Sequence, residues 1–213
     1  MITLENVEKY YGDAHVLRGI NLEVRTGEFI AVMGVSGSGK STLLNLIGGM
    51  DRPERGAIVV EGDDITRYHE DTLTVYRRKK IGFVFQFFNL LPNITVFENV
   101  QMPLLLNGMD DEERVRDVLT RVGVEGRDDS YPYQLSGGQQ QRVAIARALV
   151  HEPEIILADE PTGSLDSKTG KSVMDLLKRV AEEAGTTMVL VTHENYLAEY
   201  AVRTVKIRDG ILY

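Results

Sequence analysis

The chain has 213 residues, of which 43% are hydrophobic and 26% charged, as expected for a globular protein with one substantial core. Its 24 basic and 32 acidic residues give a formal net charge of −8, which argues against nucleic acid as the main partner. The absence of cysteine excludes disulfide bonds and thiolate metal sites and fits a reducing cytoplasm. The N-terminus lacks the pattern of a signal peptide, and no apolar run approaches the roughly 18 residues of a membrane span.

The N-terminal region predicts antiparallel strands. Apolar residues alternate with polar ones from Ile2 to Val24, and glycine-containing turns fall at Gly12-Asp13 and Thr26-Gly27. Tyr11 lies at the end of one of these strands, where its ring can either stack on a flat purine or simply pack against the protein.

A glycine loop follows the first strongly apolar run. Phe29–Met33 predicts a buried strand, Gly34–Thr42 has the spacing Gly-x-x-x-x-Gly-Lys-[Ser/Thr], and Leu43–Ile47 continues it as a helix. Glycines let successive backbone N–H groups point inward at the positive end of the helix dipole, which makes an anion-binding nest. Lys40 can then reach the β- and γ-phosphates of a nucleotide, and the Ser41 hydroxyl can ligate Mg²⁺.

The region after this helix contains a basic run and an apolar segment. The basic residues that end at Arg77–Lys80 suit nucleic acid or lipid headgroups, but a solvated helix face is the better interpretation. Ile81–Phe85 predicts a buried strand that ends at Gln86. The apolar segment Phe87–Pro92 is either core or an exposed docking surface.

Helical periodicity then runs from Val96 to Gly123, and a polar loop covers 126–134. Residues 87–152 therefore predict a helical insert within an α/β domain. Ser136, followed by two glycines at the start of another helix, is a second candidate anion site.

The last third predicts two more strands that end in polar residues. Ile155–Asp159 leads into Glu160, and Met188–Thr192 leads into His193, with an amphipathic helix over Lys168–Ala184 between them. Residues 204–212 predict a hairpin with an Asp-Gly turn. If the sheet is parallel, the polar groups at its strand ends converge on one phosphate site; they are Lys40, Ser41, Gln86, Asp159, Glu160 and His193.

The segment Leu135–Gln139, together with the glycine loop, Gln86, Asp159-Glu160, Asp166 and His193 in this order, resembles the ATP-binding cassette (ABC) ATPases, the motor subunits of ABC transport systems. The resemblance covers essentially the whole chain. It implies an α/β fold with a P-loop NTPase core and a mostly parallel sheet (1–86 and 153–213). It also implies an N-terminal antiparallel β flap and an inserted α-helical subdomain (87–152) that carries the signature segment, Leu135–Gln139.

The resemblance implies ATP and Mg²⁺ as ligands. Tyr11 would stack on adenine, with Val16 beside it. The phosphates would be held by the glycine loop, through Gly34, Ser36, Gly37, Ser38, Gly39, Lys40, Ser41 and Thr42. Mg²⁺ would be held by Ser41, Gln86 and Asp159.

The same resemblance implies the catalytic roles. Glu160 would act as general base on the attacking water, which Gln86 also senses, while His193 and Lys40 would contact the γ-phosphate. The chain would form a homodimer with ATP between the glycine loop of one subunit and the signature segment of the other. Ser136, Gly137, Gly138 and Gln139 would complete the partner's site, and Asp166 would lie across the interface.

The finer resemblance is to the lipoprotein-release, macrolide-export and cell-division group of cassettes, although Val35 and Ser164 depart from the usual residues. It implies a membrane permease as partner, contacted through residues 87–105, and a location at the cytoplasmic face of the membrane. Three alternatives stay open: the motor of a polar amino-acid importer, a cassette that acts on ribosomes or DNA, and a non-transport regulator of an enzyme outside the membrane.

Overall fold

In the computed structural model, which describes residues 1–213, the chain forms two compact units. The first unit comprises Met1–Arg77 and Gly185–Tyr213, and the second comprises Arg78–Ala184. The chain passes from the first to the second within helix α2 (Glu70–Lys80). The helical insert predicted over 87–152 has narrower bounds than the second unit and stays a prediction.

An antiparallel sheet forms the N-terminal part of the first unit. It consists of β1 (Ile2–Tyr11), β2 (Ala14–Val24), β4 (Arg55–Val60) and β5 (Asp63–Asp64), in the order β2-β1-β4-β5. Ile2 pairs with Val24 on one side and with Val60 on the other, and all three side chains are buried. The predicted antiparallel flap is confirmed. Ile2 and Leu4 follow the period of two, and a register shift between Leu4 and Val7 returns Val7 to the buried face.

The first unit also contains a mainly parallel sheet. Its strands are β3 (Phe29–Met33), β8 (Thr187–Thr192), β9 (Arg203–Arg208) and β10 (Ile211–Leu212), in the order β10-β9-β3-β8. β3 runs parallel to both β8 and β9, while β10 returns antiparallel through the predicted Asp-Gly turn. Asp209 and Gly210 both have positive φ, as a tight hairpin turn requires.

The helices of the first unit are α1 (Lys40–Ile47), the short 3₁₀ helix η1 (Ile65–Arg67) and α7 (Asn195–Ala198), with the start of α2. Only Leu73 and Tyr76 of α2 are buried, so the basic run at its end belongs to the solvated helix face that the sequence predicts.

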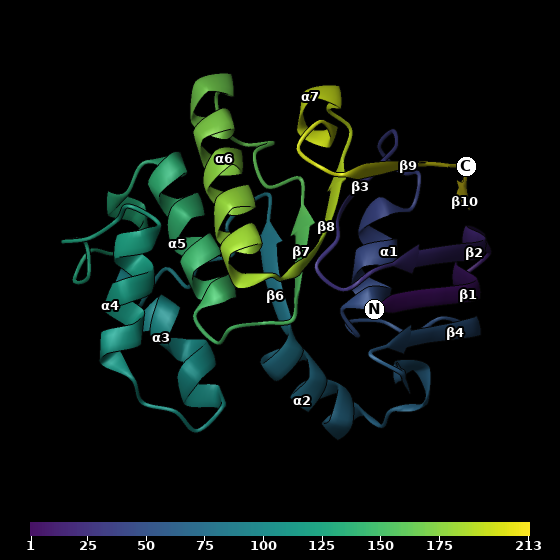
Figure 1. The fold of residues 1–213 in the computed structure, drawn as a ribbon, viewed down its shortest axis with the longest axis horizontal. Helices are drawn as coiled ribbons and strands as arrows, with labels where there is room; N and C mark the ends of the chain where they lie inside the picture. The colour runs from purple at the N-terminus through teal and green to yellow at the C-terminus, as the bar shows by residue number, and fades with distance from the viewer. The chain divides into compact units, whose positions relative to one another are not determined.

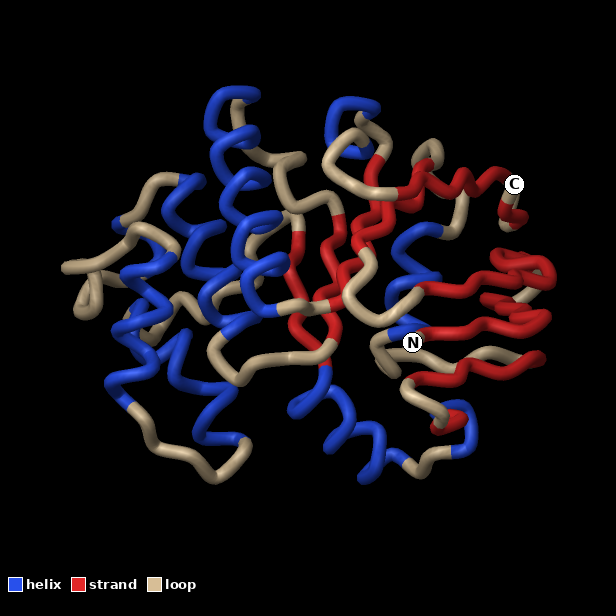
Figure 2. The backbone as a smooth tube through the Cα atoms, viewed as in Figure 1, coloured by secondary structure: helices blue, strands red, loops and turns tan.

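The second unit is helical apart from two strands (Figures 1 and 2). β6 (Ile81–Phe85) and β7 (Ile155–Asp159) pair in parallel from Ile81 opposite Ile155 to Phe85 opposite Asp159. The helices are α3 (Val96–Leu106), α4 (Glu112–Arg121), α5 (Gly137–Leu149) and α6 (Ser167–Ala184), and a 3₁₀ turn, η2, covers Pro132–Gln134.

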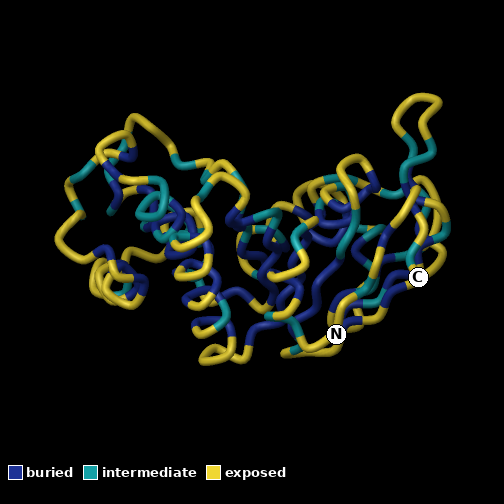
Figure 3. Tube along the Cα trace, turned by 90° about the horizontal axis from the view of Figure 1, so that it is seen from above, coloured by how far each residue is buried: buried dark blue, intermediate teal, exposed yellow.

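Apolar periodicity explains how these helices pack. The apolar residues of α6 recur at helical spacing and are buried, while the opposite face is exposed. α5 lies against β6, where a Cβ on Gly82 would collide with the carbonyl oxygen of Ala148. Exposed residues gather in the loops and on the outer helix faces (Figure 3). None of the helices combines the length and apolar character that a bilayer-spanning segment needs.

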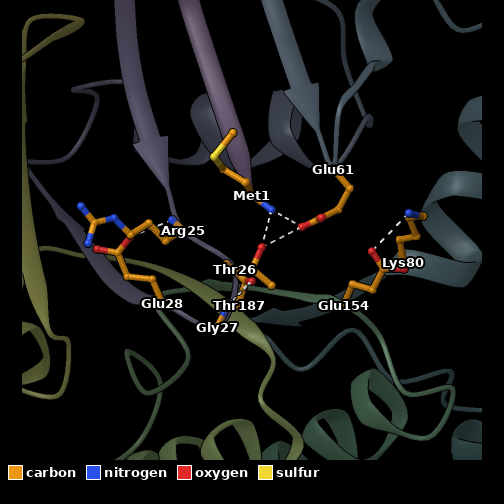
Figure 4. Close-up of polar contacts among 9 residues, drawn as sticks. All are labelled: Met1, Arg25, Thr26, Gly27, Glu28, Glu61, Lys80, Glu154 and Thr187. Carbon is orange, nitrogen blue, oxygen red and sulfur yellow. Dashed lines mark hydrogen bonds and ion pairs between the residues drawn. The ribbon is translucent and has the colours of Figure 1, made fainter.

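Polar contacts connect loops within each unit (Figure 4). The Met1 amino group donates to Thr26 Oγ1 at 2.7 Å and pairs with Glu61, which also accepts from the Thr26 hydroxyl. In the second unit, Lys80 pairs with Glu154 at 3.2 Å, which joins the end of α2 to the segment before β7. These pairs are exposed, so each contributes little to stability.

Candidate active site

The glycine loop lies between β3 and α1, as predicted, and its backbone is in close contact with its neighbours. A Cβ on Gly34 would collide with the carbonyl oxygen of Ile207 and lie 2.5 Å from Ser38 Oγ. Gly39 has φ of 104°, and a Cβ there would lie 2.7 Å from Leu17 Cδ2. The loop is anchored through Gly34 N–H, which donates to Thr192 O at 3.3 Å. Only glycine fits at these two positions.

Lys40 is held inside this loop although it carries a charge. Its side chain is only 6% exposed, and its Nζ donates to Gly34 O at 2.8 Å and to Val35 O at 3.0 Å. Lys40 is also the first residue of α1, with Gly39 as N-cap, so it opens the helix turn whose N–H groups have no partner within the helix. The loop therefore combines a cation with oriented N–H donors, which together suit a polyphosphate. Ser41 is exposed, as are Ser36 and Gly37, and Thr42 is partly exposed.

Tyr11 is fixed by residues that the sequence did not single out. Its hydroxyl donates to Asp51 Oδ2 at 2.7 Å, and Lys9 Nζ lies 5.0 Å from its ring centroid. Lys9 is 5% exposed and bonds to Asp51 Oδ1 at 2.8 Å and Arg52 O at 2.7 Å. The ring remains 49% exposed and is held at its hydroxyl and on one face. Such an arrangement presents a pre-oriented aromatic surface to a ligand.

The charges of Lys9 and Asp51 stabilise each other. Burial opposes the charge on Lys9, but its hydrogen bonds to Asp51 and Glu54 outweigh burial and raise the Lys9 pKa. Burial likewise opposes the charge on Asp51, while the hydrogen bonds from Lys9 and Tyr11 lower the Asp51 pKa below its usual value. Both groups are therefore charged at neutral pH.

Val16 and His193 also lie beside the loop in the first unit. The carbonyl oxygen of Val16 lies 3.2 Å from the position that a Cβ on Gly39 would take. His193 is exposed and directly follows Thr192, whose carbonyl anchors Gly34. The first unit thus brings together the glycine loop, Val16 and His193.

The second unit brings Gln86, Asp159 and Glu160 together. Phe85 and Asp159 pair at the ends of β6 and β7, so Gln86 and Glu160 are the next residues of two neighbouring strands. The Ser164 hydroxyl donates to Gln86 O at 2.8 Å, and a Cβ on Gly163 would lie 2.8 Å from Gln86 Nε2. The loop after Glu160 is therefore closely packed against Gln86.

The signature segment forms the start of α5. Ser136 Oγ accepts from Gln139 N at 3.4 Å and Gln139 Oε1 accepts from Ser136 N at 3.0 Å, which is a reciprocal helix cap. A Cβ on Gly138 would lie 2.5 Å from Thr169 Cγ2, and one on Gly137 would lie 3.2 Å from Leu165 Cδ2. The two glycines therefore allow the start of α5 to approach the start of α6.

Asp166 caps α6. Its Oδ1 accepts from the backbone N–H groups of Thr169 at 3.0 Å and Lys168 at 3.1 Å. Hydrogen bonds from Thr169, and then from Lys168, lower the Asp166 pKa. Asp166 and Ser136 are both exposed, so they cap their helices and remain accessible.

Three residues with long-range contacts at the site had no signal in the sequence. Asp51 orients Tyr11. Arg147 donates to Asn89 O at 2.6 Å and Phe88 O at 2.9 Å, just after Gln86. Gln141, fully buried in α5, bonds to backbone carbonyls at the ends of β6 and β7. Asp51 begins a turn that the sequence indicates, but nothing in the sequence indicates its partner, Tyr11.

Comparison with known proteins decides the family. The model of the ABC transporter family matches residues 17–163. The chain belongs to the ABC transporter family. It is an ATP-binding subunit of that family and an ATPase, as the sequence predicts.

Relatives match over nearly the whole chain. The lipoprotein-releasing system ATP-binding protein LolD of Geobacter metallireducens is 48% identical over 217 residues, which cover 99% of this chain and 96% of LolD. The macrolide export ATP-binding/permease protein MacB of Syntrophobacter fumaroxidans is also 48% identical, over 221 residues. The chain spans 31% of the length of that protein.

A solved structure confirms the fold. The ATP-binding cassette MJ0796 of Methanocaldococcus jannaschii, in a dimeric post-hydrolysis state bound to ADP and Pi, matches with a TM-score of 0.91 at 45% identity. The match covers 100% of this chain and 96% of that one. The α/β ABC ATPase fold with its antiparallel sheet is therefore confirmed.

Proposed function

We propose that this ABC ATPase is the motor subunit of a complex of the lipoprotein-release or macrolide-export type and drives a separate membrane permease. The observation that carries the proposal is the 48% identity to LolD over almost the full length of both chains. The ATP-binding part of MacB is equally similar, although MacB also contains a permease part in the same chain. By their names, LolD belongs to a lipoprotein-releasing system and MacB serves macrolide export.

ATP hydrolysis needs positioning and charge stabilisation more than covalent chemistry. Lys40 is held where it can offset charge on the β- and γ-phosphates, and exposed His193 contacts the γ-phosphate. Glu160, at the end of β7, orients the attacking water and accepts its proton, and Gln86 assists from the end of β6. Tyr11 stacks on adenine with Val16 beside it.

Mg²⁺ is part of the proposal. The candidate ligands Ser41, Gln86 and Asp159 supply a hydroxyl, an amide oxygen and a carboxylate, the oxygen donors that Mg²⁺ prefers. Mg²⁺ also requires phosphate oxygens or water, because it keeps six oxygen ligands. When bound, the ion neutralises charge that develops on the transferred phosphoryl group.

We infer that the active form is a homodimer with ATP between the glycine loop of one subunit and the signature segment of the other. MJ0796, a relative of almost the same length, has been solved as a dimer. Ser136 and Asp166 are exposed although they cap helices, which leaves both available to a partner subunit. Gly137, Gly138 and Gln139 present their backbone beside Ser136.

The segment after Gln86 is the proposed permease contact. Phe87 is 72% exposed and Leu91 is 44% exposed, which supports a docking surface over the core alternative. Exposed apolar residues close together mark interaction surfaces. A permease helix docked on residues 87–105 would hold the chain at the cytoplasmic face of the membrane. The net charge of −8 disfavours nucleic acid as an alternative partner.

Glu160→Gln tests the proposed cycle. The amide keeps the shape of the side chain but cannot accept a proton, so we expect ATP binding with hydrolysis reduced by about 100-fold or more. In saturating Mg-ATP the variant should form a long-lived dimer, measured by size-exclusion chromatography with light scattering. Glu154→Gln, an exposed glutamate before the same strand, is the matched control. A Glu160→Gln variant that stays monomeric would contradict the composite site.

Polar substitution of Phe87 and Leu91 tests the permease contact. The double change to serine should leave ATP binding intact and abolish the stimulation of hydrolysis by the permease in reconstituted vesicles. Affinity purification from the native membranes should recover a permease with the unsubstituted chain and lose it with the variant. Loss of nucleotide binding would instead show that the two residues support the fold.

A further inference from the structure

Gln141 is a fully buried amide on α5, five residues after Ser136. Its exposed fraction is 0%, and its Nε2 donates to Pro161 O at 2.6 Å and to Phe85 O at 3.2 Å. Its Oε1 is also buried and has no hydrogen-bond partner. The orientation of the amide is decided by its surroundings, because the reversed orientation would place Oε1 against two carbonyl oxygens.

The two carbonyls lie next to the two residues proposed to act on the attacking water. Phe85 immediately precedes Gln86 at the end of β6, and Pro161 immediately follows Glu160 after β7. A single side chain on a third element therefore connects the two strand ends. The link is internal to the second unit.

Glu160 needs such support because its backbone is strained. It has φ of 44°, which non-glycine residues adopt at a cost, and a following proline restricts it further. Strained residues persist only where neighbouring contacts over-determine them. Two contacts do so here: Gly163 N–H donates to Glu160 O at 3.0 Å, and Gln141 holds the next carbonyl along the chain.

We propose that Gln141 is a positioning residue. It fixes the carboxylate of Glu160 and the amide of Gln86 relative to each other, and it couples both to α5, the helix that begins with the signature segment. The proposal rests on the roles proposed above for Glu160 and Gln86. Ser136 and Gln139 cap the same helix, so a shift of α5 when a partner subunit binds the signature segment would move Phe85 and Pro161 through Gln141. Dimerisation would thereby set the geometry of hydrolysis.

Packing alone does not account for Gln141. The neighbouring buried positions of α5 are apolar, at Val143, Ala144 and Ile145. A methionine would fill a similar volume without leaving an amide oxygen unpaired in the core, which is unfavourable. The amide is therefore at this position for its two donated hydrogen bonds.

The test separates hydrolysis from binding. Gln141→Met removes both hydrogen bonds at nearly constant volume, and displacement of a catalytic group by about 1 Å costs up to roughly 100-fold in rate. We expect kcat to fall by about 10- to 100-fold. The ATP dissociation constant and KM should change less than about twofold, because Tyr11 and the glycine loop belong to the other unit. Gln140→Met is the matched control, since Gln140 lies on the same helix and donates only to the nearby Leu135 O.

Gln141→Glu gives a second, reversible readout. A neutral carboxyl group can donate one hydrogen bond to a carbonyl, whereas a carboxylate cannot donate any. Burial beside two carbonyl oxygens raises the pKa of the introduced carboxyl. We therefore expect the kcat of Gln141→Glu, as a fraction of the kcat of the unsubstituted protein at the same pH, to rise as pH falls. Gln141→Met should show no such rise.

Two results would overturn the inference. An unchanged kcat in folded Gln141→Met would show that the link is not needed, and a flat pH profile of Gln141→Glu relative to the unsubstituted protein would do the same even if the methionine variant fails to fold. The proposed function is judged separately by Glu160→Gln. If that variant hydrolyses ATP normally, the role of Glu160 fails; if it is inactive while Gln141→Met is normal, only the role of Gln141 fails.

Discussion

The glycine loop of the first unit and the strand ends of the second unit achieve their backbone shapes in different ways. In the glycine loop, positive φ occurs only at Gly37 and Gly39, and Gly34 and Gly39 lie where no Cβ fits. In the second unit, non-glycine residues carry the unusual conformations: Phe88 and Asn89 after Gln86, with φ of 60° and 50°, and Glu160. The glycine loop thus avoids backbone strain, whereas the strand ends of the second unit include strained residues.

Side chains hold the strained region in place. The Arg147 guanidinium donates to the carbonyls of Phe88 and Asn89, and Gln141 donates to those of Phe85 and Pro161. Burial lowers the Arg147 pKa, but a guanidinium remains charged at any physiological pH. The region proposed for ATP binding thus depends on backbone sterics, whereas the region proposed for hydrolysis and coupling depends on a few side-chain contacts. On the proposals above, we expect a partner to adjust the second region rather than the first.

Gly34→Ala should have the largest effect, since it breaks the steric basis of the loop. The new methyl group would meet the Ile207 carbonyl, and overpacking of this kind costs about 1–3 kcal/mol. We expect ATP binding, measured by isothermal titration calorimetry, to weaken roughly 10- to 100-fold. Gly19→Ala is the control, because Gly19 has positive φ but no atom within 4 Å of the added Cβ. Equal affinities of the two variants would refute the steric explanation.

Arg147→Met should affect the second region and spare the first. Without the guanidinium, the carbonyls of Phe88 and Asn89 lose their donor, at a cost of about 1–3 kcal/mol in unfolding free energy. ATP affinity should stay within about twofold, while kcat and stimulation by the permease fall. Arg142→Met serves as control, since Arg142 lies on the same helix as Arg147 but donates to Val122 O and Ser172 Oγ instead. A parallel loss of ATP affinity would show that the two regions are not separable in this way.

Tyr11→Phe sharpens the description of the binding region. The ring remains, but its hydrogen bond to Asp51 is lost, which is worth about 0.5–1.5 kcal/mol. We expect ATP affinity to fall about twofold to tenfold. Tyr10→Phe, which loses only a 3.1 Å bond to Glu8, should bind ATP normally. If both variants bind equally, the Asp51 contact does not orient the ring.

The pH dependence of binding should show the smallest effect. Burial raises the Asp51 pKa, but hydrogen bonds from Lys9 and Tyr11 outweigh it, so the folded value lies below the ordinary one of about 3.9. A depressed carboxyl pKa contributes stability above the unfolded value, and this contribution is lost as pH falls through the folded value. The orientation of Tyr11 should therefore persist down to about pH 4 and weaken below it. Dissociation constants of an ATP analogue, measured against pH, should show the loss in the unsubstituted protein and a smaller loss in Tyr11→Phe.

Helices and strands were predictable where a pattern among neighbouring residues determines them. Alternating apolar residues predicted β1 and β2, and the spacing of the glycine loop with its flanking strand and helix predicted β3 and α1. The sequence predicted helical structure from Val96 to Gly123 but not the break between α3 and α4. The structure divides it because Gly108 adopts positive φ after α3 and Asp111 caps α4 by accepting from Arg114 N at 3.0 Å. The short helix α7 has too few residues to show a periodicity.

What the sequence by itself determined is the family, the order of the polar strand ends and the glycine loop, because each depends on residues within a few positions of one another. Only the tertiary structure decided which side chains hold them. Tyr11 and Asp51 are 40 residues apart, Phe85 and Gln141 are 56 apart, and Asn89 and Arg147 are 58 apart. A side-chain donor meets a distant acceptor only after the helices and strands have packed. Such pairings have no local pattern, and they set the orientation of Tyr11 and the backbone on either side of Gln86 and Glu160.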